Sequence, residues 1–366
     1  MGAGPIGFAE SQTVNGLVVS HQQALSGTRN CGALGINSDE SDDWEIEMQY
    51  DVAIVGAGSA GLTAALVLSR ARRRVVVIDA GEQRNSKSLH LHGFLSRDGM
   101  SPKDLLKVGT GEVVSYGGEV INDRVAAIEE NSECGFSLQL AGGQNLSART
   151  VVVASGLRDE LPVIPGLRKR WGEDVLHCPY SHGYEVSDTP LGVVGGENRT
   201  FSLHQATLIR GWSDDVVFFP NTITLTPAEH ERIVAFGVQI VDGEVARVVE
   251  EDDRLTGVEM ADGRIVPRSA VFIGPRFEPQ DQLLKDLGCA VGENGWVTID
   301  PTGATSLVGV WAAGNVVDSP AQLVTAAGNA TVAAVAVNHH LLAEDIEQSL
   351  VDYRKYLKEM NSCVRM

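Results

Sequence analysis

A glycine-rich loop at residues 56–61, which reads Gly-Ala-Gly-Ser-Ala-Gly, constrains the fold of this chain more than any other segment. An apolar run at 52–55 precedes the loop, helical spacing of leucines and alanines follows it, and a second apolar run lies at 75–78. A strand, a tight turn, a helix and a second strand within about thirty residues predict a βαβ unit.

The spacing of the glycines indicates a bound dinucleotide. Gly56 would make the tight turn, Gly58 would let backbone amides approach a pyrophosphate, and Gly61 would let the helix pack on the strand. The positive end of the helix dipole would face the phosphates, and Asp79 at the end of the second strand would accept hydrogen bonds from a ribose. The predicted cofactor contacts in this unit are Gly56, Gly58, Ser59, Ala60, Gly61 and Asp79.

The composition excludes several classes of protein. With 29 basic and 48 acidic side chains the formal net charge is −19, which disfavours nucleic acids and anionic membrane surfaces as partners. Five scattered cysteines are too few for a disulfide framework and fit a reducing, cytoplasmic setting. The most apolar late stretch, 323–343, is broken by polar residues, so it predicts a buried alanine-rich helix and not a membrane span.

Further apolar runs predict strands at 151–154, 192–194, 216–219, 271–273 and 310–311. Strands separated by helical stretches indicate parallel sheets that are covered on both faces. A second, degenerate glycine turn follows the run at 192–194, which indicates a duplicated dinucleotide-type unit. The predicted fold class is therefore α/β with two Rossmann-like, three-layer dinucleotide-binding domains.

A resemblance to a known family is carried by residues 303–316, which read GATSLVGVWAAGNV. This stretch resembles the second flavin motif of the FAD-dependent pyridine-nucleotide disulfide oxidoreductases, where a strand ends in Ala-x-Gly-Asp. After Gly314, Asn315 replaces the family's aspartate, so it keeps an acceptor oxygen but loses the charge. Gln322 matches the glutamine at the start of the family's next helix, whose positive end lies near the flavin. The resemblance implies FAD in the first dinucleotide site.

A more specific resemblance is carried by residues 81–102, which read GEQRNSKSLHLHGFLSRDGMSP. They resemble thioredoxin-reductase-like flavoenzymes, above all the holomycin- and gliotoxin-type dithiol oxidases that close disulfides in sulfur-containing natural products. An Arg-Asn pair precedes histidines in those enzymes, which implies that Arg84 and Asn85 lie near the FAD. The likeness covers most of the chain, and it also implies a homodimer.

The redox motif of this family has lost one cysteine in this chain. Residues 176–185 read LHCPYSHGYE, where the family has His-Cys-Pro-Tyr-Cys-His-Gly-Tyr-Glu. By correspondence with the family, Ser181 stands in place of the flavin-facing cysteine. A serine hydroxyl has no accessible disulfide chemistry, so an internal dithiol relay between Cys178 and position 181 is excluded.

Four interpretations of the altered motif remain open. Cys178 is a lone nucleophile favoured by His177 or His182, or the flavin acts on the substrate directly with His182 as general acid or base. In the third interpretation, a distant thiol, Cys363 or Cys31, completes the pair. In the fourth, catalysis is lost and a flavin-binding scaffold remains.

The second glycine turn departs from a nucleotide-binding loop. Residues 191–200 read LGVVGGENRT, so Glu197 occupies the third glycine position and would repel phosphates. Residues 218–221 lack the arginine cluster with which thioredoxin reductases bind the 2′-phosphate. Both departures make NAD(P)H a doubtful cofactor, with Arg199 and Arg210 as the cations able to compensate.

The resemblance and these motifs together predict the organisation of the chain. The expected parts are an FAD-binding domain at 48–157 and 275–346, an inserted NAD(P)-type domain at 158–274 that carries the altered motif, and a C-terminal tail at 347–366. Residues 1–47 are expected to be a disordered extension, unless Met48 is the true start. We expect no metal site, and we expect Cys134 and Cys289 to be buried structural cysteines.

The leading functional hypothesis is an FAD-dependent oxidoreductase that acts on a thiol or a thiol-derived small molecule. A tailoring step in specialised metabolism fits the resemblance. One alternative is an NAD(P)H-dependent reductase of a disulfide or peroxide that uses Cys178 with a distant thiol. The other is the flavin-binding, non-catalytic scaffold.

Overall fold

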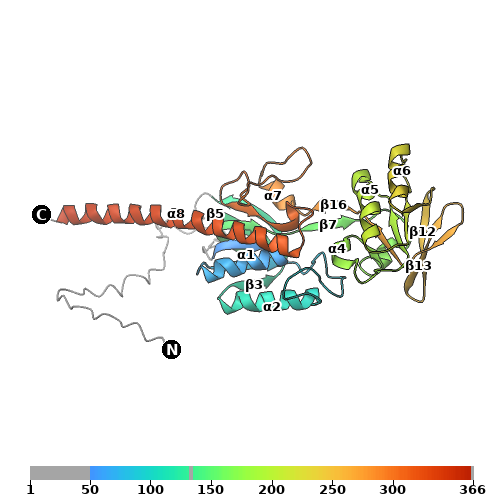
Figure 1. Cartoon of the computed structure of the whole chain (residues 1–366). Coiled ribbons are helices and arrows are strands. Elements are labelled where there is room, and N and C mark those ends of the chain that lie inside the picture. The colour runs from blue at the N-terminus through green and yellow to red at the C-terminus, as the bar shows by residue number, and fades with distance from the viewer. Residues whose placement is uncertain (1–49, 132–134, 364–366) are drawn as a thin grey trace, which may run out of the picture. The chain divides into compact units, whose positions relative to one another are not determined.

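The computed structural model describes residues 50–131 and 135–363 (Figure 1). The expected disordered extension at 1–47, the alternative start at Met48, and the cysteines Cys31 and Cys134 lie outside these residues. Within the described ranges, the helices are all too short or too polar to cross a membrane.

The first sheet grows from the βαβ unit that the glycine loop predicted. Its strands are β1 (Tyr50–Val55), β2 (Val75–Asp79), β3 (Glu119–Asn122), β4 (Val125–Asn131), β5 (Gly135–Leu140), β6 (Asn145–Val153) and β17 (Val310–Ala312). The strand order is β3-β2-β1-β6-β5-β4, and β17 pairs with the C-terminal half of β6. The β1, β2, β3, β6 and β17 pairings are parallel, whereas β4 and β5 run antiparallel to their neighbours.

Successive residues of the central strands point to opposite faces, and each face is covered. On one face, helices α1 (Ser59–Arg70) and α8 (Leu323–Cys363) pack side by side against the sheet, with α2 (Pro102–Ser115) beside α1 (Figure 1). On the other face, α7 (Gln282–Asp286) and the segment that follows it cover the strands, and Cys289 is buried there as expected. The result is the three-layer architecture predicted from the sequence.

The second sheet is entirely parallel and has the order β11-β10-β9-β15-β8. Its strands are β8 (Val175–Leu176), β9 (Leu191–Val194), β10 (Val216–Phe219), β11 (Gln239–Ile240) and β15 (Ala270–Ile273). The helices of this part are α3 (Leu167–Arg170), α4 (Pro179–His182), α5 (Arg199–Leu208) and α6 (Pro227–Ala235). Strands β9, β10 and β15 are buried along their whole length, which explains why their apolar runs were readable in the sequence.

A two-stranded ribbon carries the chain between the two sheets. Strand β7 (Leu157–Glu160) leads out of the first part, and β16 (Arg276–Pro279) leads back into it. The two strands pair antiparallel, with Phe277 opposite Asp159. The ribbon therefore brings residues more than one hundred positions apart in the sequence to the same place.

Two sequence expectations differ from the structure. The antiparallel strands β4 and β5 were not among the strands expected from the sequence. The same is true of the three-stranded antiparallel sheet β12 (Val245–Glu251), β13 (Arg254–Met260) and β14 (Ile265–Pro267). These strands are buried on one face only, so they lack the continuous apolar runs used to find the others. In addition, residues 347–363 of the expected tail continue helix α8.

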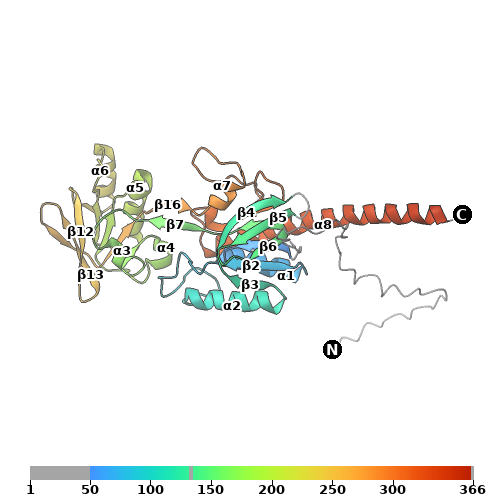
Figure 2. The same ribbon diagram turned by 180° about the vertical axis from the view of Figure 1, so that it is seen from behind.

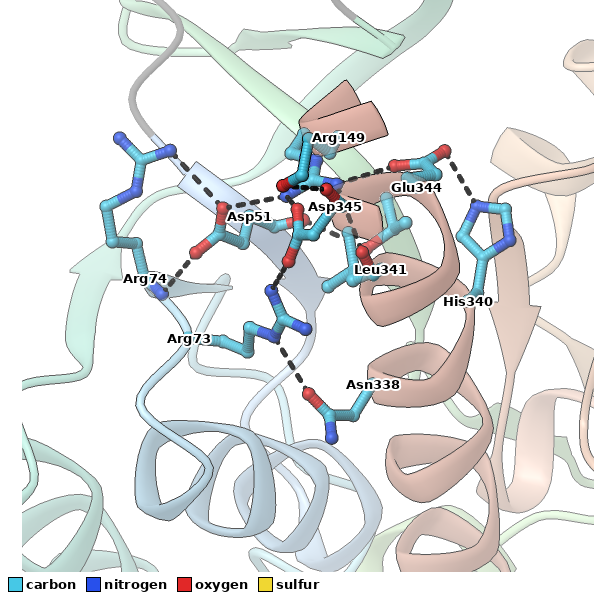
Figure 3. A network of polar contacts seen from close by, with 11 residues as sticks. Asp51, Arg73, Arg74, Arg149, Asn338, His340, Leu341, Glu344 and Asp345 are labelled. Carbon is cyan, nitrogen blue, oxygen red and sulfur yellow. Dashed lines mark hydrogen bonds and ion pairs between the residues drawn. The ribbon is translucent and has the colours of Figure 1, made fainter. Parts of the chain in front are cut away.

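Helix α8 is fixed to the sheet by a group of charged side chains (Figure 3). Arg149 of β6 binds Glu344 and Asp345 of α8, each at 2.8 Å. Arg73, which follows α1, binds Asp345 at 2.7 Å and Asn338 at 2.8 Å. Because two different arginines hold one aspartate, the direction in which α8 leaves the sheet is determined at this point.

Candidate active site

A cavity of about 310 Å³ is lined both by the first glycine loop and by the altered redox motif. The predicted cofactor residues that line it are Gly56, Gly58, Ser59, Ala60, Asp79, Arg84, Asn85, Gly314, Asn315 and Gln322. The predicted catalytic residues that line it are His177, Cys178, Ser181 and His182. The structure thus brings into one cavity two groups of residues that lie in separate parts of the sequence.

The glycine loop has the geometry of a phosphate cradle. Gly56 has φ +100°, and a Cβ there would lie 2.6 Å from the Ala154 carbonyl oxygen. A Cβ at Gly61 would lie 1.8 Å from the Gly56 carbonyl oxygen, so Gly61 packs helix on turn and does not line the cavity. A Cβ at Gly58 would meet nothing within 4 Å, which leaves the backbone open to a ligand there.

The start of α1 offers free donors to an anion. Gly58 is the N-cap of α1, and no side chain of the described residues caps this helix. The first-turn amides of a helix lack partners within the helix, and they carry its positive dipole end. Asp79 accepts hydrogen bonds from the Ala57 amide at 2.9 Å and from Gln83 Nε2 at 2.7 Å. This open cradle fits the pyrophosphate and ribose of FAD.

Asn315 has a structural task that its sequence position did not reveal. Its Nδ2 donates to the carbonyl oxygens of Asp318 and Ala321, both at 2.9 Å, and to that of Ser319 at 3.3 Å. Its Oδ1 accepts from Arg84 Nη1 at 3.4 Å. An aspartate has no hydrogen on the side chain to donate when ionised, so the amide is what holds residues 318–321 in place before α8.

Arg84 ties the loop after β2 to the ribbon between the sheets. It makes a two-pronged ion pair with Asp159, through Nε at 2.8 Å and Nη2 at 2.7 Å. Its guanidinium carbon lies 5.1 Å from the ring centre of Phe277. A charge-assisted pair with two parallel hydrogen bonds fixes the orientation of the guanidinium as well as its distance from the carboxylate. The Arg84 side chain is therefore held in one orientation where it lines the cavity.

The altered motif forms a single helical turn. Cys178 is the N-cap of α4, and its carbonyl oxygen accepts from the amides of Ser181 at 3.2 Å and His182 at 3.1 Å. Residues three and four positions apart share one face of a helical turn, and here both positions line the cavity with Cys178. Gly183 is required behind this turn, because a Cβ there would lie 2.7 Å from Trp212 Nε1.

Both histidines of the motif are held neutral by burial. Desolvation lowers the pKa of His177, whose Nδ1 lies 3.2 Å from the Ile273 carbonyl oxygen. Desolvation also lowers the pKa of His182, and its two buried ring nitrogens have no hydrogen-bond partner among the described residues. A neutral imidazole with an unpartnered nitrogen in a cavity can accept a proton, which is the behaviour of a general base.

A third histidine, His92, connects this motif with the loop after β2. His92 Nε2 lies 3.2 Å from Glu185 Oε1, and His92 Nδ1 lies 3.4 Å from Asp98 Oδ2. Sequence reasoning placed no function on His92 or Glu185. Glu185 could have been singled out, because it is the last residue of the redox motif. No neighbouring residue in the sequence indicated that its partner would be His92.

The second glycine turn is arranged differently from the first. The amide of Gly196 donates to Ser202 Oγ at 3.0 Å, and the amide of Phe201 donates to Asn198 Oδ1 at 3.0 Å. Two of the donors that a phosphate could use are therefore already paired inside the protein. Glu197 lies 3.7 Å from Arg276 and remains largely exposed.

The two arginines able to compensate for Glu197 are also engaged. Arg199 contacts Glu229 and the Thr224 carbonyl oxygen, and Arg210 contacts Asp214 and the Ser213 carbonyl oxygen. Each cation thus has an anionic partner of its own close by. Because both arginines are paired with acids, neither offsets the negative charge that Glu197 brings to the second glycine turn.

Comparisons with known proteins agree with these features. Residues 50–330 match the family model described as pyridine nucleotide-disulphide oxidoreductase. The thioredoxin reductase sirT of Leptosphaeria maculans is 26% identical over 81% of this chain and 96% of its own length. A probable thioredoxin reductase of Arthroderma benhamiae is 34% identical over 41% of this chain, which spans 38% of that protein. The crystal structure of HlmI matches 84% of this chain and 97% of its own, with 50% identity and a TM-score of 0.81.

Proposed function

Since the chain belongs to the pyridine nucleotide-disulphide oxidoreductase family and is an FAD-dependent oxidoreductase, we propose that it oxidises a thiol-bearing small molecule without an internal dithiol. The observation that carries the proposal is the shared cavity, in which the FAD cradle faces a turn with one thiol, one hydroxyl and one neutral histidine. The likeness of residues 81–102 to dithiol oxidases supports a tailoring step in natural product metabolism.

The residues that would hold the cofactor belong to the first sheet. The amides at the start of α1 would bind the pyrophosphate, and Asp79 would accept from the ribose. Gly314 and Asn315 line the part of the cavity next to the start of α8. When bound, FAD supplies a two-electron acceptor for the substrate.

The substrate is proposed to meet the flavin directly. Oxidation of two thiols to a disulfide releases two protons and two electrons, so a base is needed next to the sulfur. His182 supports this role, because its pKa is lowered by burial and its ring nitrogens are unpartnered. Ser181 can orient a substrate thiol through its hydroxyl but cannot form a disulfide with it.

A second candidate is a single-thiol route through Cys178. This cysteine is half-buried and lines the same cavity, so a substrate disulfide could exchange with it. The product of that exchange is a mixed disulfide between Cys178 and one substrate sulfur, with the other sulfur released as a thiol. Removal of Cys178 separates this route from direct oxidation.

NAD(P)H is proposed to be a poor electron donor for this enzyme. The amides of the second glycine turn are occupied by Ser202 and Asn198, and Arg199 and Arg210 are paired with acids. We propose that dioxygen is the electron acceptor, as the resemblance to oxidases implies.

The test is the anaerobic reduction of the yellow protein, followed by its flavin absorbance. We expect dithiothreitol, as the dithiol probe, to bleach the flavin faster than an equal concentration of NADPH. Cys178→Ala should keep this bleaching, because direct oxidation needs no protein thiol, and it should lose the mixed disulfide that the parent protein forms with an oxidised dithiol if the single-thiol route operates. Rapid bleaching by micromolar NADPH would overturn the proposal, and Ser181→Ala is the matched control for the motif.

A further inference from the structure

One wall of the cavity differs in charge from the chain as a whole. Residues 83–97, which follow β2, contain three lysine or arginine side chains and two histidines, and no aspartate or glutamate. The whole chain has 48 acidic and 29 basic side chains. Both views show this loop beside α4, and His92 of the loop contacts Glu185 just after α4 (Figures 1 and 2). A basic wall in an acidic protein favours an anion at that place.

Most charged side chains that line the cavity already have partners in the protein. Arg84 is paired with Asp159 through two hydrogen bonds. Glu82 lies 2.7 Å from Arg124. Asp79 accepts hydrogen bonds at the cofactor cradle. These groups therefore have little charge left to offer to a substrate.

Lys87 differs from these groups. Its side chain lines the cavity and is exposed, and among the described residues it has no partner for a hydrogen bond or an ion pair. A lysine side chain carries a positive charge on a flexible stem and offers three donors. The cavity thus contains a cation whose charge and donors the described part of the protein does not use.

The surroundings of Lys87 place this cation on the side of the thiol turn. A Cβ on Gly172 would lie only 3.3 Å from the Lys87 Cβ, so Lys87 packs directly on this glycine. Gly172 also lines the cavity, and its amide donates to the Val175 carbonyl oxygen at 2.9 Å, where β8 begins. Strand β8 ends two residues before Cys178. The cradle for the pyrophosphate, in contrast, lies at the start of α1 in the first half.

We propose that Lys87 binds a carboxylate of the thiol substrate, so that the enzyme prefers an anionic dithiol to a neutral one. This inference rests on the proposed function, because it names the substrate class of the same site. The ion pair would form at an exposed part of the cavity, where water and salt weaken it. We therefore expect Lys87 to change the affinity for an anionic substrate about fivefold and to leave the chemistry at the sulfurs unchanged.

The first test measures binding without turnover. Lipoate and lipoamide are closed disulfides that differ only in a carboxylate and a carboxamide, and the Cys178→Ala background excludes thiol exchange with either probe. In calorimetric titrations of the flavin-loaded protein, lipoate should bind about fivefold more tightly than lipoamide. Lys87→Met should remove this difference, and Lys87→Glu should reverse it. Equal affinity for the two probes, or binding of neither, overturns the inference.

The second test uses the reduced probes and the protein with Cys178 intact. Anaerobic bleaching of the flavin by dihydrolipoate should reach half its maximal rate at an about fivefold lower concentration than bleaching by dihydrolipoamide. The two maximal rates should be similar, since Lys87 binds the carboxylate and not the sulfurs. In Lys87→Met the two half-saturating concentrations should become equal. A lower maximal rate with both dithiols and an unchanged preference would show a merely structural role, which contradicts the proposal.

Lys103→Met is the matched control. Lys103 is an exposed lysine of α2 that does not line the cavity, so its removal changes the net charge equally and should keep the preference for the carboxylate. Flavin content should be the same in Lys87→Met and Lys103→Met. A specific loss of flavin from Lys87→Met would assign this lysine to the phosphates of FAD and would overturn the inference.

The two tests separate this inference from the proposed function. If lipoate binds through Lys87 but no dithiol bleaches the flavin, the anion site stands and dithiol oxidation is wrong. If both dithiols bleach the flavin and neither lipoate nor dihydrolipoate is preferred, dithiol oxidation stands and the carboxylate site is wrong.

Discussion

Both glycine turns of this protein lie between a parallel strand and a helix, and they differ in the occupation of their backbone amides. At the first turn, α1 begins without a side-chain cap and the amides face a cavity. At the second turn, Ser202 and Asn198 accept the hydrogen bonds of the Gly196 and Phe201 amides. We therefore propose that the first turn, whose donors stay unpaired, holds a nucleotide and that the second does not.

This difference separates two tasks between the two halves. The first half keeps the cradle for the cofactor, and the second half contributes the turn with Cys178, Ser181 and His182 to the same cavity. The second half thus has a dinucleotide-type fold, and in the proposed function it supplies side chains for chemistry. Fold and ligand are separable properties of the same architecture.

The largest effect is expected when a side chain is added inside the first glycine turn. Gly61→Ala should give protein without flavin and with a lower melting temperature, because its Cβ would lie 1.8 Å from the Gly56 carbonyl oxygen. Overpacking of this kind costs about 1–3 kcal/mol or more. Gly58→Ala is the matched control, since its Cβ meets nothing within 4 Å and should affect flavin content but not stability. Equal loss of stability in both variants would contradict this account.

Removal of the proposed base tests the task given to the second half. His182→Gln should lower the rate of dithiol oxidation by about a hundredfold, in the range for a lost general base. In the parent enzyme the rate should fall as the pH drops through the pKa of His182, which burial holds below its usual value of 6.5. The variant should lose this acidic limb of the pH profile. A variant that keeps the limb would remove His182 from the role.

Ser181→Cys sharpens the comparison by restoring the missing sulfur. The expected result is a new long-wavelength absorption band from a thiolate against the flavin. The band should appear in the flavin-loaded variant and be absent from Ser181→Ala. If the band does not appear, position 181 does not face the flavin ring. The proposal that residues 178–182 lie against the flavin held by the first half would then be wrong.

At the second turn, the charge of Glu197 and the partners of the backbone amides can be removed one after the other. Glu197→Gly alone should leave the reduction by NADPH slow, because the Gly196 and Phe201 amides stay occupied. Adding Asn198→Ala and Ser202→Ala frees both amides and should raise the rate several-fold, with a loss of about 1 kcal/mol from the helix cap. Fast reduction in the single variant would show that charge alone had closed this site.

The smallest expected effect concerns stability in acid. Burial lowers the pKa of His177 and His182 in the folded protein, so the unfolded chain binds protons that the folded chain does not. Stability should therefore be unaffected at neutral pH and should fall as the pH drops below about 6.5. A melting-temperature series from about pH 7 to pH 5 measures this, with the His177→Gln variant expected to show a shallower fall.

The sequence predicted features whose signals are local. Gly56, Gly58 and Gly61 lie within six residues, and the apolar strands around them are buried on both faces, so pattern alone indicated the unit. The CPYS turn was found from its resemblance to the family's redox motif, which is also a local signal. Each of these signals depends on neighbours along the chain and not on contacts across the fold.

What the sequence did not reveal depends on distant pairs. Arg84 meets Asp159 across 75 positions, and His92 meets Glu185 across more than ninety. No periodicity reports such contacts. The paired amides of the second turn were also hidden, because asparagine and serine are preferred in turns and at helix starts in general, so their presence does not show which amides they bind.

One amide side chain joins the cofactor end of the cavity to the longest helix. Asn315 holds three carbonyl oxygens of the segment that leads into α8, while it lines the cavity. An empty cradle would leave only the protein's own hydrogen bonds, those of Asn315 among them, to hold residues 318–321. Protease cleavage at that segment should therefore report flavin loss, which makes limited digestion a simple assay of cofactor occupancy.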